Sequence, residues 1–353
     1  TDRQTDRQTD RQTDRQTRDY NIDLIRILAC IAVVGLHTLP KDLSTTMAAL
    51  YYFCGFAVPA FFMSSGYFLL NRGKVTISYS KHKCFGIIRV VIGWNFIITI
   101  LRVLKAILLQ EKIIDEVLRF PVECVKCVLQ KGTLWHFWYL GALMIIYLLI
   151  PVISRLTNKK RIILFIYTGV IAIAIELTSF YLGSPMQKYV IQTFRLWTWI
   201  FYFLLGSQML KIRKGFSEYI SVKAHAILFF IYTLIIVGYQ MYVGSNLITE
   251  NSNRLHAEYF YDSLVEMIWI AILFSLLLRV NLSSKVKRII SDVVPLTMGI
   301  YITHPLIIKV VVRLIGNGSI LIALASWIIT VVLSVICTYI IIKIKWCRFL
   351  IKV

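Results

Sequence analysis

Long apolar runs separated by short basic segments dominate the chain from residue 20 onward. A bilayer core of about 30 Å needs about 20 apolar residues per helix, and each run is of this order. The runs are 22–40, 46–70, 85–109, 134–154, 161–181, 194–211, 223–243, 259–280, 293–314 and 319–343. They predict an all-α fold: a polytopic membrane bundle of about ten transmembrane helices.

The segments between the runs are too short and too apolar for a soluble catalytic domain, so any chemistry is expected inside the bundle. The longest loop, 111–131, contains Pro121 and mixed charges and is expected to hold an interfacial helix. The composition agrees with a membrane protein, because only 16% of residues are charged and soluble domains have about 25%. Without a cleavable signal pattern, the first run is expected to target the chain.

The N-terminal tail is polar and repetitive, unlike the apolar runs that follow it. Residues 1–16 read TDRQ four times, and this polar repeat predicts a disordered segment over 1–19, followed by a membrane domain over 20–353. A gene tract of repeated ACAG units, read in frame, would encode this Thr-Asp-Arg-Gln repeat. We therefore hypothesise that slippage in the tract makes expression phase-variable, as suits genes that alter a microbial surface. The alternative is a polar tail without a role, and mixed synonymous codons in the gene would support it.

The basic residues predict the orientation of the chain. Of the 39 Lys and Arg residues, 25 lie in the tail, in alternate loops and at the C-terminal end, and seven lie in the opposite loops. This bias predicts that both termini are cytoplasmic and that the number of spans is even. The net charge of +21 therefore reflects topology, and no nucleic-acid partner is expected, because no basic face carries interleaved aromatic residues.

Ionisable residues inside a membrane are costly, about 2.5–3.5 kcal/mol each for Arg, Lys or Asp, and so point to function. The candidates are Asp23, Arg26, His37, Arg89, His136, Glu176, Arg195, Asp262, Glu266 and His304. Asp23 and Asp262 lie near span ends and are expected to reach water. Cys124 and Cys127 form a C-x-x-C pair without a second pair or a nearby histidine, so no metal site is expected. Two cysteines one helical turn apart are expected to be unpaired, and a periplasmic disulfide is the alternative.

Arg26 and His37 stand eleven residues apart on the first run, close to three helical turns, so they share nearly one face. The spacing corresponds to about 16 Å along the axis. This places Arg26 near the expected cytoplasmic end and His37 in the outer half.

The predicted topology puts further ionisable groups at the depth of His37, namely His136, His304, Glu176 and Glu266. Three imidazoles and two carboxylates at one level can handle protons. The alternative for each histidine is a packing hydrogen bond, and for His136 an interfacial aromatic belt.

Five motifs, in order, resemble the acyltransferase-3 family of membrane O-acyltransferases. Arg26 and His37 match its Arg-x10-His signature. The other motifs are FFMSSGYF at 61–68, LWHFWYL at 134–140, YFLLG at 202–206 and GIYITHP at 299–305. The family's Arg-x-x-Arg pair before the third span is absent, and Lys83 and Arg89 stand near its place. No esterase-like domain, as some relatives carry, follows in this sequence, so the chain is expected to act alone or with a separate partner.

The resemblance implies transfer of an acetyl group from cytoplasmic acetyl-CoA, as co-substrate, to a hydroxyl of a cell-envelope glycan or a lipid-linked sugar, such as a lipopolysaccharide or capsule precursor. It also implies the bacterial inner membrane. The expected donor-binding residues are Arg26, Lys83, Arg89, Ser65 and Tyr67. The expected catalytic residues are His37, Glu266, Glu176 and His304. The expected acceptor-binding residues are His136, Trp138 and Tyr301. Packing is the alternative role for Ser64 and Ser65.

His37 is expected either to deprotonate the acceptor or to carry the acetyl group itself. The main rival is a transporter or flippase for a glycan precursor, although no internal repeat of the kind transporters often show is evident. A membrane sensor is a second rival.

Overall fold

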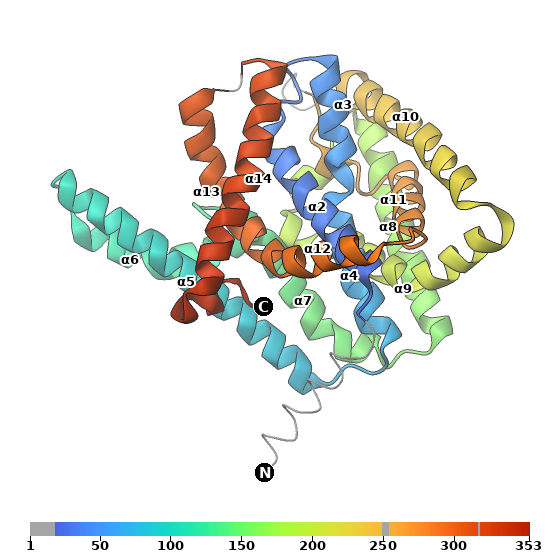
Figure 1. Cartoon of the computed structure of the whole chain (residues 1–353), viewed down its shortest axis with the longest axis horizontal. Helices are drawn as coiled ribbons and strands as arrows, with labels where there is room; N and C mark the ends of the chain where they lie inside the picture. The colour runs from blue at the N-terminus through green and yellow to red at the C-terminus, as the bar shows by residue number, and fades with distance from the viewer. Residues whose placement is uncertain (1–17, 249–253, 317) are drawn as a thin grey trace, which may run out of the picture.

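The computed structural model describes residues 18–248, 254–316 and 318–353, and within these ranges the chain is helical without a β-strand (Figure 1). The α-helices are α2 Tyr20–Thr38, α3 Thr45–Phe53, α4 Ala57–Asn71, α5 Ile77–Leu108, α6 Ile113–Val128, α7 Trp138–Ile153, α8 Asn158–Leu182, α9 Leu196–Tyr219, α10 Val222–Asn246, α11 Leu264–Leu277, α12 Ser284–Val293, α13 Thr297–Ile315 and α14 Ile320–Lys343. The all-α prediction is confirmed. The TDRQ repeat lies outside the described residues.

Short 3-10 helices connect or extend several of these helices. They are η1 Cys54–Phe56, η2 Trp135–Phe137, η3 Met186–Tyr189, η4 Gln192–Phe194, η5 Ala257–Tyr259, η6 Val294–Leu296 and η7 Lys345–Ile351. Among them, η1 joins α3 to α4 as one continuous span, and η2 begins the span of α7.

All ten predicted runs fall on helices. Eight helical segments of the described chain are long and apolar enough to cross a membrane. The runs 194–211 and 259–280 fall on α9 and α11, which are not among these eight; α11 has only 14 residues. The multi-pass membrane architecture is thus established, and the predicted number of spans and the orientation remain predictions.

Helix α2 lies at the centre of the bundle, against α4, α11, α13 and α14. The Asp19 carboxylate accepts hydrogen bonds from the backbone N–H groups of Asn21 and Ile22 and so caps its first turn. The Asn21 amide donates to the carbonyls of Leu277 and Val280 at 2.7 and 2.8 Å, which ties α2 to the end of α11. Both Arg26 and His37 are therefore carried by a well-fixed central helix of about 28 Å.

Helices α4 and α9 approach each other at two glycines. A Cβ at Gly66 would lie 1.7 Å from the Phe203 carbonyl oxygen, and one at Gly206 would lie 2.0 Å from the Met63 carbonyl oxygen. Small residues allow such close contact between membrane helices. Both glycines belong to the family-like motifs, so these motifs have a packing role.

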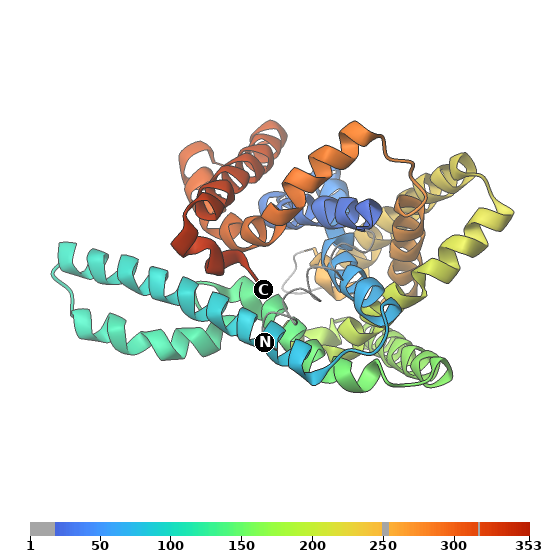
Figure 2. The ribbon, with the colours of Figure 1, turned by 60° about the horizontal axis from the view of Figure 1, so that its bottom comes forward.

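Helices α5 and α6 form a hairpin that extends beyond the other helices (Figure 2). The predicted helix in loop 111–131 is α6, with Pro121 inside it. Arg102 of α5 pairs with Glu123 of α6 at 3.2 Å, and Cys124 and Cys127 are free thiols. These contacts hold the hairpin together without a disulfide between these two cysteines.

Candidate functional site

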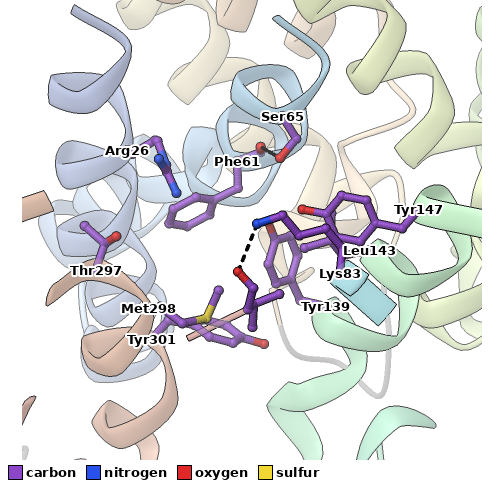
Figure 3. A pocket seen from close by; sticks show the side chains of 11 residues that line it. Arg26, Phe61, Ser65, Lys83, Tyr139, Leu143, Tyr147, Thr297, Met298 and Tyr301 are labelled. Carbon is purple, nitrogen blue, oxygen red and sulfur yellow. Dashed lines mark hydrogen bonds between the residues drawn. The ribbon is translucent and has the colours of Figure 1, made fainter. Parts of the chain in front are cut away.

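Two adjoining cavities, here called the Arg26 cavities, surround Arg26. Their volumes are about 550 and 130 Å³, and Arg26, Ser65, Lys83 and Tyr147 line both. Figure 3 shows Arg26 of α2 on one side of the smaller cavity, and Lys83 of α5 with Tyr147 of α7 on the other. The structure thus brings together two cations from helices that are distant in the sequence.

The larger Arg26 cavity carries more positive than negative side chains. Arg18, Arg26, Arg72 and Lys83 line it against Asp19 and Asp23. Asp23 pairs with Arg18 at 2.6 Å and with Arg26 at 3.9 Å. Lys83 Nζ donates to the Val353 backbone oxygen at 3.1 Å. The cationic excess suits an anionic ligand, and guanidinium and ammonium groups both bind phosphates.

The other residues expected at this end take different positions. The Ser65 hydroxyl donates to the Phe61 carbonyl at 3.0 Å while lining both cavities. The Tyr67 hydroxyl donates to the Asp19 carboxylate at 2.9 Å, so it supports the cap of α2. Arg89 is exposed on α5, over the Phe85 ring, and does not line the Arg26 cavities.

His37 lines a third cavity, of about 450 Å³, here called the His37 cavity. Trp135 and Trp138 form part of its wall, and the Trp135 ring meets the His37 ring edge-on at 5.2 Å between centroids. The Trp138 ring is held by a tilted stack on Trp199 at 5.3 Å. The imidazole of His37 is therefore in contact with an open space rather than packed away.

A series of rings joins the wall of the smaller Arg26 cavity to the wall of the His37 cavity. Tyr139 and Tyr301 line the smaller Arg26 cavity, with ring centroids 5.4 Å apart. Tyr301 lies 6.1 Å from His304, and His304 stacks on His37 at 5.4 Å with an angle of 23°. In the described chain, packed side chains therefore lie between the smaller Arg26 cavity and the His37 cavity.

His304 and His136 each use one ring nitrogen in a hydrogen bond to a backbone carbonyl. His304 Nδ1 donates to the Ile300 carbonyl at 3.1 Å, and His136 Nε2 donates to the Ile302 carbonyl at 3.1 Å. The Tyr301 hydroxyl donates to the backbone carbonyl of His136. Each of these nitrogens must carry a proton, so in the neutral ring the other nitrogen is an acceptor. Those acceptors, His304 Nε2 and His136 Nδ1, are buried and have no partner in the described chain.

The three histidines therefore meet, as their predicted depths indicated. His136 lies 5.8 Å from His304 between ring centroids and is only 2% exposed. This burial inside the bundle excludes the alternative of an interfacial belt. Two of the imidazoles present unprotonated nitrogens to the interior, which is the form that accepts a proton.

The two predicted carboxylates form a separate group. Glu176 accepts from Gln187 at 3.5 Å and from Tyr239 at 3.4 Å, and Glu266 accepts from Gln240 at 2.8 Å. Within the described residues, none of these bonds reaches an imidazole. Glu176 and Glu266 were expected beside the histidines because they are predicted to lie at the same depth. In the structure, both carboxylates instead bind residues of α10.

Asp23 and Asp262, expected to reach water, are buried at 5% and 2% exposure. Asp262 accepts hydrogen bonds from Gln187, Trp197 and Thr198. The expectation is wrong for Asp262, because the protein supplies polar partners that replace water there. Asp23 is mostly buried, but it lines the larger Arg26 cavity.

Four polar residues that were not predicted from the sequence share the cavity with His37, and two of them come from the segment before α11. His256, Glu258, Gln192 and Tyr51 line the His37 cavity. Glu258 is held from behind by Arg195 at 3.7 Å and by a hydrogen bond from Gln192. The signal for them in the sequence was the cluster of His256, Glu258 and two tyrosines over 256–261.

Residues 19–343 match the family model of the acyltransferase-3 domain, described as an acyltransferase domain. The chain belongs to the acyltransferase-3 family. Membership extends over nearly the whole described chain and includes both the Arg26 cavities and the His37 cavity. The matched region is therefore a multi-pass domain of this family, and Arg26 and His37 lie at opposite ends of the ring series.

Two curated relatives of this acyltransferase-3 protein carry other names. An amino-acid racemase of Enterococcus faecalis is 27% identical over 312 residues, which cover 83% of this chain and 42% of that protein. A serine/alanine racemase of Enterococcus gallinarum is 30% identical over 135 residues, 36% of this chain and 18% of that protein. The chain thus spans less than half the length of these relatives. No solved structure matches it.

Proposed function

We propose that this chain transfers an acetyl group from acetyl-CoA to a hydroxyl of a cell-envelope glycan or a lipid-linked sugar in the bacterial inner membrane. The observation that carries the proposal is the ring series from the Arg26 cavities to the His37 cavity. It gives the donor and the acceptor separate compartments on the two sides of one reaction centre.

The Arg26 cavities are the proposed donor site. Acetyl-CoA carries several phosphate charges, and the larger cavity has a cationic excess that would bind them. The narrower cavity, lined by Tyr139 and Tyr301, would take the uncharged pantetheine arm and the thioester. The positive-inside prediction places this end at the cytoplasm, where acetyl-CoA is made.

The His37 cavity is the proposed acceptor site. Its wall combines aromatic rings with a carboxylate, amides and imidazoles. A sugar presents apolar C–H faces and hydroxyl groups, so such a wall matches both. Movement of the Tyr301 or His304 side chain would join the two cavities during the reaction.

In the proposed reaction, His37 takes the proton of the acceptor hydroxyl as its oxygen attacks the thioester carbon. The new C–O bond forms, the C–S bond breaks, and the thiolate of CoA receives the proton. His304 stacks on His37 and has an unprotonated Nε2, so it can relay that proton. General-base help of this kind contributes about 10²–10⁴-fold.

The alternative route forms an acetyl-imidazole on His37, which the acceptor then attacks. Incubation of purified protein with radiolabelled acetyl-CoA in the absence of acceptor separates the two routes. Label retained on a His37 peptide indicates the covalent route, and its absence during steady turnover indicates direct transfer.

Labelling of native membranes tests the proposed function, because the acceptor need not be known. Membranes that contain the protein should convert radiolabelled acetyl-CoA into base-labile label on envelope glycan. A transporter or flippase would leave acetyl-CoA unconsumed and the glycan unlabelled. Racemase activity is not proposed, because the matched segment covers less than half of the proteins so named.

Arg26→Ala and Lys83→Ala are each expected to raise the KM for acetyl-CoA about tenfold or more, because each removes a charged partner worth about 1.5–3 kcal/mol. Arg89→Ala should raise the KM less, since Arg89 lies outside the cavities. Initial rates over a range of acetyl-CoA concentrations measure this. Lys214→Ala, at a side chain 80% exposed, is the control, and an unchanged KM in both cavity variants would contradict the donor site.

A further inference from the structure

A tyrosine–histidine pair lines the same cavity as His37, the residue at the centre of the reaction proposed above. Tyr51 of α3 and His256 of the loop before α11 both line this cavity. The Tyr51 hydroxyl lies 3.3 Å from His256 Nδ1, and it accepts a hydrogen bond from the Ala257 N–H at 3.1 Å. Tyr51 is buried, whereas His256 is exposed to the open space.

This arrangement assigns the protonation of the His256 ring. The phenol oxygen accepts a hydrogen bond from the backbone of Ala257, and within the described residues His256 Nδ1 is the acceptor within reach of its single proton. Nδ1 is then the acceptor, and in the neutral ring Nε2 carries the proton. Within the described residues, no hydrogen bond engages that Nε2–H group.

We propose that His256 is an acceptor-positioning residue, whose Nε2–H donates a hydrogen bond to an acceptor oxygen next to the reacting hydroxyl. The proposal rests on the proposed function. His256 exchanges no proton in the transfer, and the hydroxyl proton still passes to His37 and then to the thiolate. The role of Tyr51 is to fix the ring and keep the proton on Nε2.

The chemistry of the acceptor follows from this geometry. The group bound by His256 must be a hydrogen-bond acceptor that shares the cavity with the reacting hydroxyl, as in a vicinal diol or a ring oxygen. An acceptor with an isolated hydroxyl would not engage both imidazoles. The pair therefore favours polyhydroxylated acceptors over simple alcohols.

Two amide substitutions test the assigned nitrogen. The Gln amide nitrogen reaches about as far as Nε2, whereas the Asn amide nitrogen reaches only as far as Nδ1. In native membranes given radiolabelled acetyl-CoA, H256A and H256N are expected to label glycan about tenfold less than wild type. H256Q should stay within about twofold, and Tyr51→Phe should lose about threefold. The KM for acetyl-CoA should not change in any of them.

Equal labelling by H256N and H256Q would overturn the proposal, because a merely structural role would not distinguish the two amides. Wild-type labelling by H256A would also overturn it. Two other outcomes would instead contradict the proposed function itself. In the first, wild-type membranes label no glycan; in the second, His37→Ala membranes label glycan as fully as wild type. Size-exclusion profiles in detergent confirm that each variant is folded.

Discussion

His37→Ala is expected to abolish acetyl transfer while the protein still inserts and accumulates in the membrane. The imidazole lines a cavity rather than filling the core, so its removal should cost little stability. If His37 acts as general base, the rate should fall by about 10²–10⁴-fold, and if it carries the acetyl group, the loss should be complete. Glycan labelling in native membranes from radiolabelled acetyl-CoA measures both.

The matched control is His82→Ala, a histidine on the exposed surface of α5. It should keep wild-type labelling at equal protein abundance. His304→Ala tests the neighbour that stacks on His37, and it should reduce the rate less than His37→Ala if His304 only relays the proton. Normal transfer by His37→Ala would remove this residue from the mechanism.

The meeting of the histidines could be predicted because depth along a membrane helix is set by a fixed rise per residue. Counting from the expected membrane surfaces put His37, His136 and His304 at one level, and their rings are in contact. The same counting put Glu176 and Glu266 at this level, but their hydrogen bonds are to Gln187, Tyr239 and Gln240. Depth gives no information on which way a helix faces, and only packing decides that.

The loop residues were the harder part of the site to predict. His256 and Glu258 lie outside the apolar runs, where no periodicity fixes their position. Their position in the wall of the His37 cavity depends on the path that the chain takes between α10 and α11. Arg89 was expected at the donor site because it stands near the place of the family's Arg-x-x-Arg pair, but it is exposed on α5 over the Phe85 ring.

The motif glycines show that a family signature combines chemistry with packing. Gly66 and Gly206 belong to FFMSSGYF and YFLLG, yet neither lines the described cavities. Each lies against the backbone of the opposite helix, at the contact of α4 with α9. The same helix α4 carries Ser65 into the Arg26 cavities. Motif residues can therefore be indispensable without touching a substrate.

Gly66→Ala and Gly206→Ala are therefore expected to be the most destabilising single-methyl changes in the chain. The added Cβ would lie 1.7 or 2.0 Å from a backbone carbonyl oxygen, far inside contact distance. A carbonyl cannot rotate away as a side chain can, so α4 and α9 must separate. Overpacking costs typically 1–3 kcal/mol, and we expect about 3 kcal/mol or more here, seen as a loss of folded protein or a Tm lowered by about 4 °C or more.

Gly215→Ala in α9 and Gly238→Ala in α10 are the matched controls, because a Cβ at either position would meet no atom within 4 Å. Alanine is favoured over glycine in a helix by about 1 kcal/mol, so these two variants should keep or slightly raise the Tm. The Tm of all four variants is compared by heating the protein in detergent and measuring the fraction that stays monodisperse. If Gly66→Ala unfolds at the temperature of Gly215→Ala, the close contact of α4 with α9 does not exist. In that case Ser65 would not be held at the Arg26 cavities in the way described, and the donor site would need a different wall.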